Sequence, residues 1–228
     1  MKKYAVLHEP GDIVTLAGTR FVVLDVERRG SLPDSLFLLA LESVGTSEFG
    51  SSNNYAESDL KKAVDKWLED MDKRGLDNAK LIPREIDLTT LDGSGCYGKL
   101  SGKAAPLTLD EAREYADIIP NAGGWCWLAT GWSGPSESDG DFALFVGSNG
   151  DWSCDYCSSS YGIRPALLLP SSLLVSDDGT VSTNTAPSTP GSISVPSSIM
   201  GGTNISISWA NSSAAASTHA LYKVELST

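Results

Sequence analysis

The fold is decided by two apolar stretches, Trp125-Cys126-Trp127-Leu128-Ala129 and Tyr161-Gly162-Ile163-Arg164-Pro165-Ala166-Leu167-Leu168-Leu169. Each is bounded by Gly or Pro and has the length and composition of a strand buried on at least one face. Between them, residues 131–141 and 148–160 consist largely of Ser, Asp, Asn, Gly, Tyr and Trp. Tyr and Trp give large contact area at low entropic cost, and Ser, Gly and Asn give adaptable hydrogen bonds. The sequence therefore predicts a rigid scaffold that carries polar recognition loops.

The composition limits the classes of partner. The 228 residues are 41% hydrophobic, which is enough for one substantial core and a second small module. A formal net charge of −12 would repel nucleic acid and anionic membrane surfaces, so neither is expected as a partner. The longest apolar runs, such as Leu36–Leu41, are far shorter than the ~20 residues of a membrane span, so no membrane insertion is expected.

The N-terminus and the cysteines argue against export and against a disulfide framework. Tyr4–Leu7 follows two lysines but is too short for the apolar region of a secretory signal, so export by that route is not expected. The four cysteines are too few and too unevenly spaced for a disulfide framework in a chain of this length. We therefore expect the core to hold itself together without cross-links.

The first part of the chain has the pattern of an α+β domain. Tyr4–Leu7, Ile13–Leu16 and Arg20–Val26 are short runs separated by turn residues, which predicts an antiparallel meander. Leu36–Leu41 is apolar throughout, which predicts a strand buried on both faces at the centre of the sheet.

Two helices are predicted to cover this sheet. Glu57–Met71 carries apolar residues at the spacing of one helix face. A second helix opens near Leu107, with Thr108 and Glu111 placed as a capping box, and ends at Pro120. The glycine-rich stretch 76–103 between them predicts loop with at most one short strand. Residues 1–176 are thus expected to form one domain with two helices on a twisted, mainly antiparallel sheet.

The composition changes after residue 176. Residues 177–190 have the Ser/Thr/Pro content of a linker, and residues 191–228 contain three predicted strands, Ser192–Val195, Asn204–Trp209 and Tyr222–Leu226. This segment resembles the first half of a fibronectin type III module through Ala186-Pro187-Ser188-Thr189-Pro190, Trp209 and Tyr222. Such a module has about seven strands, so we expect the others to come from beyond the given sequence or from a neighbouring chain.

Three segments of the first domain together resemble a family of largely uncharacterised domains found in phage-encoded and gut-bacterial proteins. They are Ser52-Asn53-Asn54-Tyr55-Ala56-Glu57-Ser58-Asp59-Leu60, Trp125-Cys126-Trp127-Leu128-Ala129-Thr130 and Tyr161-Gly162-Ile163-Arg164-Pro165-Ala166-Leu167. The pattern is similar to the C-type-lectin-like fold, which is also that of formylglycine-generating enzymes and of the variable proteins of diversity-generating retroelements. By this resemblance, residues 132–160 would form the binding face and Gly162-Ile163-Arg164 the closing strand. The resemblance implies an architecture and names no ligand.

The candidate ligand-binding residues come from these polar segments. Trp132 and Trp152 are candidate anchors because they are large aromatics in polar surroundings, although a loop tryptophan can equally fold back on its own scaffold. Arg164 lies in an apolar strand, where we expect a structural role paired with a carboxylate or carbonyls rather than a ligand contact. The full candidate set is Trp132, Asp139, Asp141, Ser148, Asn149, Asp151, Trp152, Asp155, Tyr156, Ser158 and Tyr161.

The polar segments also offer possible metal ligands and catalytic residues, although ordinary loops have the same residue types. Cys154-Asp155-Tyr156-Cys157 has zinc-knuckle spacing, but a strong zinc signal needs a second such pair, and Cys96 and Cys126 are single; a local disulfide and plain thiols remain alternatives. Loop oxygens could ligate calcium, although acidic turns are common without it; these are Glu137, Asp139, Asp141, Asn149, Asp151 and Asp155. Only His8 and His219 could serve a nucleophile, and paired carboxylates are a weak sign of a hydrolase. We expect no catalytic residue, no metal and no cofactor.

The function expected from the sequence is recognition without catalysis. We expect a protein of a phage virion that is assembled in the host cytoplasm, forms a homo-oligomer with other virion proteins, and binds a host cell-surface glycan or protein from a head or tail fibre. The alternatives are a structural or decoration protein of the capsid or tail, and an enzyme of the formylglycine-generating type. Exposed loop aromatics favour the first, aromatics buried between subunits the second, and a metal or reactive thiol in a cleft the third.

Overall fold

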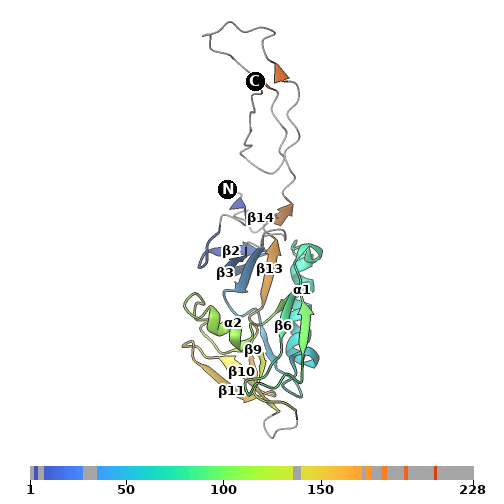
Figure 1. Cartoon of the computed structure of the whole chain (residues 1–228), viewed down its shortest axis with the longest axis vertical. Helices are drawn as coiled ribbons and strands as arrows, with labels where there is room; N and C mark the ends of the chain where they lie inside the picture. Colours follow the sequence, from blue (N-terminus) through green and yellow to red (C-terminus); the bar gives the residue numbers. More distant parts are fainter. Residues whose placement is uncertain are drawn as a thin grey trace, which may run out of the picture. The chain divides into compact units, whose positions relative to one another are not determined.

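A computed structural model describes residues 3–4, 8–27, 35–135, 140–170, 173–175, 181–183, 193–194 and 208–209. The chain divides into two units, Met1–Val181 and Ser182–Thr228, which are described separately. The first unit contains mainly antiparallel sheets and, within its described residues, two α-helices, so the predicted α+β class is confirmed. Figure 1 shows these elements coloured along the sequence.

The first five-stranded sheet has the order β2-β3-β4-β13-β8. Its strands are β2 (Ile13–Leu16), β3 (Thr19–Glu27), β4 (Ser35–Ala40), β13 (Ala166–Pro170) and β8 (Ala104–Ala105). All neighbouring strands are antiparallel. Every residue of β4 is buried, and β4 occupies the middle of the sheet, as its continuous apolar sequence predicts.

The second five-stranded sheet has the order β11-β10-β9-β12-β5. Its strands are β5 (Thr46–Glu48), β9 (Cys126–Gly131), β10 (Phe142–Val146), β11 (Trp152–Tyr156) and β12 (Ser160–Gly162). The pairing of β12 with β9 is parallel, and the other pairings are antiparallel. The prediction of a single sheet under two helices is therefore wrong, because β12 and β13, separated by only three residues, belong to different sheets.

Shorter pairings complete the described structure. A hairpin joins β6 (Arg84–Asp87) to β7 (Lys99–Gly102). A small sheet has the order β1-β14-β15, with β1 (Lys3–Tyr4), β14 (Leu173–Val175) and β15 (Val181–Thr183). The expected meander is confirmed for β2 and β3, but β1 pairs with β14 instead of β2.

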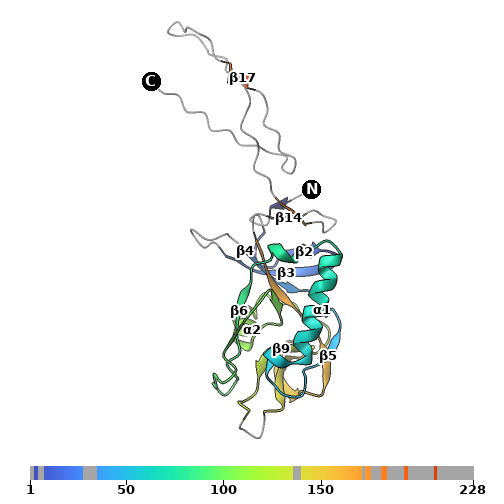
Figure 2. The ribbon, with the colours of Figure 1, turned by 90° about the vertical axis from the view of Figure 1, so that its right-hand side faces the viewer.

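Helix α1 (Asp59–Lys73) begins and ends with recognisable caps. Ser58 is its N-cap and its hydroxyl accepts a hydrogen bond from Lys61 N at 2.9 Å. At the other end, Leu76 N donates to Met71 O and Gly75 N donates to Asp72 O, which is a Schellman motif. A 3-10 helix, η2 (Tyr55–Glu57), precedes α1, and another, η3 (Asn78–Lys80), follows it. Figure 2 shows α1 extending alongside both five-stranded sheets.

Helix α2 (Leu109–Glu114) carries the predicted capping box but is shorter than predicted. Thr108 Oγ1 accepts from Glu111 N, while a Glu111 carboxylate oxygen accepts from Thr108 N at 2.8 Å. The helix ends at Glu114, and hydrogen-bonded turns over Tyr115–Ile119 lead to Pro120.

The core consists of two clusters of buried side chains. The first lies under α1 and includes Phe49, Tyr55 and Trp127, the last of which is 1% exposed. The second lies under α2 and includes Phe37, Leu109 and Leu128. Trp67 of α1 is half-buried and packs against the first cluster, with its ring 6.3 Å from that of Phe21.

Beyond the end of β15, the second unit is described at two short strands. β16 (Ile193–Ser194) and β17 (Ser208–Trp209) pair antiparallel, with Ile193 opposite Trp209. They fall within the predicted strands Ser192–Val195 and Asn204–Trp209. The third predicted strand, Tyr222–Leu226, lies outside the described residues, and the fibronectin-like module and the linker at 177–190 stay predictions.

Candidate recognition surface

Strands β10 and β11 divide the candidate residues between two faces of one sheet. Their register places Trp152 opposite Val146 and Tyr156 opposite Phe142. Residues opposite each other in an antiparallel pair point to the same face, and neighbours along a strand point to opposite faces. Trp152, Cys154 and Tyr156 therefore share one face, and Ser153 and Asp155 share the other. The expectation that residues 148–160 form loop is wrong, because β11 is a strand at the edge of the sheet.

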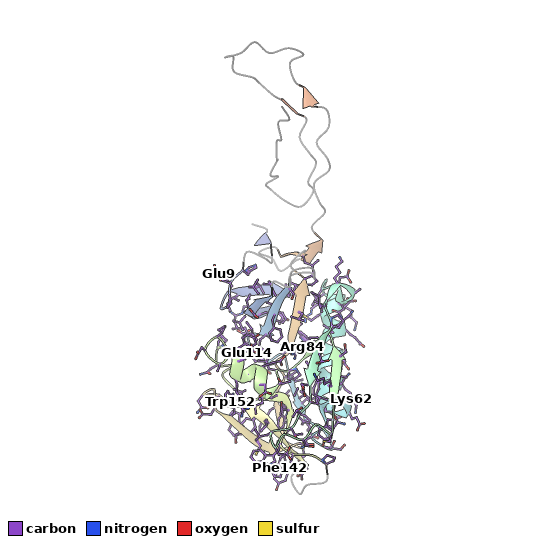
Figure 3. All side chains as sticks on the ribbon, viewed as in Figure 1. Glu9, Lys62, Arg84, Glu114, Phe142 and Trp152 are labelled. Atoms are coloured by element: carbon purple, nitrogen blue, oxygen red, sulfur yellow. The ribbon has the colours of Figure 1, made fainter. Side chains whose placement is uncertain are left out.

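The first face presents two exposed aromatic side chains. Trp152 is 42% exposed and Tyr156 is 53% exposed. The Arg113 guanidinium lies 5.5 Å from the centre of the Trp152 ring, and the Tyr156 ring lies 4.3 Å from that of Phe142. Figure 3 shows Trp152 near Glu114 of α2 and Phe142 farther along the sheet. Both exposed rings are thus held by neighbours on the scaffold.

The second face uses its polar residues internally. Asp155 accepts hydrogen bonds from the hydroxyls of Tyr161 and Ser159, and from Tyr156 N at 2.7 Å. These donors hold the pKa of Asp155 below its ordinary value, and the Tyr161 hydroxyl contributes most. Burial, followed by the bond to Asp155, raises the pKa of Tyr161 to about 12. Asp155 and Tyr161 thus form a structural pair on this face.

Trp125 is an exposed aromatic that the sequence interpretation placed in a buried strand. It precedes β9, is 49% exposed, and stacks on Phe145 with a ring separation of 5.1 Å. Its ring also lies 5.2 Å from that of Tyr161. Phe145 is the neighbour of Val146 along β10, and Val146 is the cross-strand partner of Trp152, so Phe145 and Trp152 point to opposite faces. Trp125 stacks on Phe145 and therefore lies on the face opposite Trp152. The sequence did not predict this exposure, because the residues that follow Trp125 are apolar.

The turn between β10 and β11 is held by two of the candidate residues. The Asn149 side chain accepts from Asp151 N and donates to the Asp151 carboxylate. Gly147 N donates to Asp151 O at 2.7 Å, which closes the turn. Ser148, Asn149 and Asp151 are exposed. Their turn chemistry fixes the backbone beside Trp152.

The remaining candidates do not gather at one place. Trp132 is half-buried and packs against the second core cluster. It therefore folds back on its own scaffold, which is the alternative to a binding anchor that the sequence left open. Asp141 is exposed beside the start of β10, and Ser158 is exposed in the turn before β12. Asp139 lies outside the described residues. The structure therefore brings together Asn149, Asp151 and Trp152, with Tyr156 farther along the same strand.

The segments that carry the family resemblance have structural roles. Asn53 is 1% exposed; its Nδ2 donates to Ser133 O at 2.9 Å and Phe142 O at 3.0 Å, and its Oδ1 accepts from the Tyr97 hydroxyl. Gly162 lies so close to β9 that a Cβ atom there would be 2.9 Å from Cys126 Sγ. The predicted closing strand Gly162-Ile163-Arg164 is corrected: residues 163–165 form the connection between β12 and β13.

Arg164 lies at a cavity of about 280 Å³ between α2, the segment after it, and the first face of the second sheet. Arg164 is 6% exposed, and its Nε donates to Ala40 O at 2.7 Å. Burial lowers its pKa from the usual value of an arginine. The expected pairing with a carbonyl is confirmed. The cavity itself was not foreseen, because it is formed by residues far apart in the sequence.

The cysteines do not assemble in the way a four-thiolate site requires. Cys96 is exposed, whereas Cys126 and Cys157 are buried and Cys154 is half-buried. Burial raises the pKa of Cys157 to about 12, with a further contribution from Asp141, and burial also raises that of Cys126. Across the described ranges, no three His, Cys, Asp or Glu side chains are grouped as metal ligands would be.

Comparison of the chain with models of protein families, with curated proteins and with solved structures gave no match. None of the helices in the described part of the chain is long and apolar enough to cross a membrane.

Proposed function

We propose that this chain is a recognition protein of a phage particle, in which a C-type-lectin-like domain binds a host cell-surface ligand through the first face of its second sheet. The observation that carries the proposal is the pair of exposed rings on β11, Trp152 and Tyr156. A few large aromatics usually supply most of the energy of an interface. The phage origin and the lectin-like family rest on the resemblance of the three sequence segments.

The rigidity of the two rings supports a binding role. Tyr156 packs against Phe142 with the two rings tilted, and Trp152 contacts Arg113 of α2. A ring that is already held in place loses less conformational entropy when it binds. The turn at residues 147–151 fixes the backbone next to Trp152 in the same way.

A decoration protein is the second candidate, and the position of β11 favours it. Within the described residues β11 pairs only with β10, so it is an edge strand of the sheet. An edge strand with exposed aromatics can also pair with a neighbouring subunit. In that case the same rings would be buried in the assembled particle.

The test compares the two faces of the sheet. The full chain is labelled and applied to a printed array of bacterial surface glycans and to isolated envelopes of gut bacteria. We expect the double variant Trp152→Ala/Tyr156→Ala to weaken binding at least about tenfold, equivalent to 1.4 kcal/mol. Trp125→Ala is the matched control, because Trp125 is equally exposed but lies on the opposite face.

The outcomes separate the candidates. Loss of binding in the double variant but not in the control supports recognition by this face. Equal binding of all three proteins contradicts it. Normal envelope binding combined with failure of the double variant to enter particles supports the decoration role instead.

A further inference from the structure

The cavity beside Trp152 is lined by polar groups as well as by apolar walls. The apolar walls are formed by Leu107 and Ala112 around α2, by Ile119 after it, and by Leu128 and Val146 of the sheet. Trp152, Asn149 and Asp151 stand at the rim. Its volume of about 280 Å³ is close to the lower end of the range for small-molecule sites, ~300–1,000 Å³. The cavity therefore suits a compact apolar group.

One cation is buried at this cavity, and no carboxylate of the described part of the chain forms an ion pair with it. Arg164 lines the cavity, and its Nε is satisfied by Ala40 O. Its Nη2 is buried and finds no hydrogen-bond acceptor among the described residues. Glu42 acts on Arg164 only through its charge and forms its ion pair with Arg20 on the surface. A buried guanidinium with an unused donor is costly, so a group that supplies an acceptor and a negative charge gains free energy here.

We propose that this cavity binds the C-terminal carboxylate of a peptide that ends in a small apolar residue. The carboxylate accepts from the Arg164 guanidinium, whose planar fork of donors matches its geometry. The apolar side chain lies against Leu107, Leu128 and Val146. The inference rests on the proposed function in one respect: the rest of the ligand leaves the cavity beside Trp152 and lies on the recognition face.

The charges at the cavity restrict the ligand further. Among the described lining residues Arg164 is the one cation, which matches one negative charge, and the Asp151 carboxylate at the rim disfavours a second one. An acidic sugar has the carboxylate but carries hydroxyl groups that the part of the cavity formed by Leu107, Leu128 and Val146 would leave unpaired. A peptide terminus with one carboxylate and an aliphatic side chain carries a single negative charge and places no hydroxyl group against the apolar walls.

The test uses small probes and the full chain. N-acetylvaline, in each enantiomer, is titrated into the protein while the indole N–H signals of Trp127 and Trp152 are followed by NMR. We expect saturable shifts of both signals, and at least about tenfold weaker binding of N-acetylvalinamide, which has the same shape without the charge. Glucuronic acid is the third probe, and we expect it to bind more weakly than N-acetylvaline.

Two variants test the location. Ala116→Phe places a ring in the cavity from an exposed lining position and should abolish binding of the acid. Ala79→Phe, at an exposed alanine of η3, is the matched control and should bind normally. Arg164→Met should remove the preference for the acid over the amide, and the Ala116→Phe result stands even if that variant does not fold.

Several results would overturn the inference: equal binding of acid and amide, unchanged binding by Ala116→Phe, tighter binding of glucuronic acid, or no saturable shift at all. Its failure is distinguishable from that of the proposed function. If Ala116→Phe still binds envelopes while Trp152→Ala/Tyr156→Ala does not, the recognition face stands and the carboxylate site is wrong. If the acid binds as expected but the face variants bind envelopes normally, the carboxylate site stands and the function assigned to the face is wrong.

Discussion

Asn53 is a buried residue whose side chain connects three separate segments of the domain. It donates to Ser133 O and Phe142 O and accepts from the Tyr97 hydroxyl, and its backbone N–H donates to Gly140 O at 3.2 Å. The segment after β9 and the start of β10 are thereby attached to the residues that precede η2. Asn53 of the Ser52–Leu60 segment thus stabilises the position of β10, the strand beside β11 in the recognition face.

Replacing Asn53 should destabilise the protein without touching either exposed ring. Asn53→Ala removes three side-chain hydrogen bonds, which takes the Asn53 donor from Ser133 O and the acceptor from the Tyr97 hydroxyl, whereas Phe142 O keeps its bond from Trp132 N. We expect the free energy of unfolding in urea to fall by about 2–4 kcal/mol, because each buried unsatisfied group costs ~1–3 kcal/mol. Ser51→Ala, at an exposed neighbour, should change it by less than about 0.5 kcal/mol. A loss below about 1 kcal/mol in Asn53→Ala would contradict this role.

Asp155 should give the stability a pH dependence. Its pKa is lowered in the folded state by the Tyr161 hydroxyl and the other donors, so its contribution is present above the unfolded pKa, about 3.9, and is lost as the pH falls through the folded value. Asp155→Asn should therefore destabilise the protein most at neutral pH, and the difference from wild type should shrink below about pH 4. Unfolding in urea at several pH values measures this. Asp117→Asn, at an exposed carboxylate, is the control; a difference that stays constant with pH would contradict the prediction.

At the scale of elements, local chemistry predicted the helices better than the strands. The capping box of α2 needs only Thr108 and Glu111, which are three residues apart, and it forms as predicted. The glycines of residues 76–103 predicted loop with at most one short strand, but the β6–β7 hairpin forms there, with Arg84 at a buried position although arginine is usually found on surfaces. Arg84 is stabilised there by Glu111 and by the carbonyls of Ala105 and Pro106, partners that only the tertiary structure supplies.

Strand β11 was missed for a related reason. Its five residues, Trp152–Tyr156, are mainly polar or exposed, so they show no apolar alternation. The strand forms because β10 offers it a matching register from Phe142 to Val146. The position of Trp152 and Tyr156 on one face follows from this register and could not be derived from loop composition.

The turn between β2 and β3 offers a stabilising substitution. Ala17 has a φ of +45° and Gly18 of +78°, as the central residues of a two-residue hairpin turn of type I′ require. A left-handed conformation costs an alanine about 1–2 kcal/mol, whereas asparagine tolerates it better. Ala17→Asn should therefore raise the free energy of unfolding by about 0.5–1 kcal/mol in urea melts. The same change at Ala79 in η3 should give no gain; equal effects at both sites would contradict the turn assignment.

At the scale of the whole first unit, one continuous segment joins the two large sheets. β12 ends at Gly162 in the second sheet and β13 begins at Ala166 in the first. The connection is held on both sides, since Val44 N donates to Ile163 O and Arg164 Nε donates to Ala40 O. The first core cluster also contains residues of both sheets, including Leu38 of β4 and Trp127 of β9.

These connections imply that the two sheets unfold together. Leu38 is fully buried in the first sheet, and Leu38→Ala should cost about 2–5 kcal/mol. The Trp127 indole N–H donates to Ser47 O at 2.9 Å within the second sheet, so its hydrogen exchange reports the opening of that sheet. We expect Leu38→Ala to reduce the protection of this proton by the same free energy by which it reduces global stability in urea. Leu91→Ala, at an exposed leucine, should change neither quantity. If protection of the Trp127 proton were unchanged in Leu38→Ala while global stability fell, the second sheet would be an independent folding unit. The stability of the recognition face would then not depend on the strands of the first sheet.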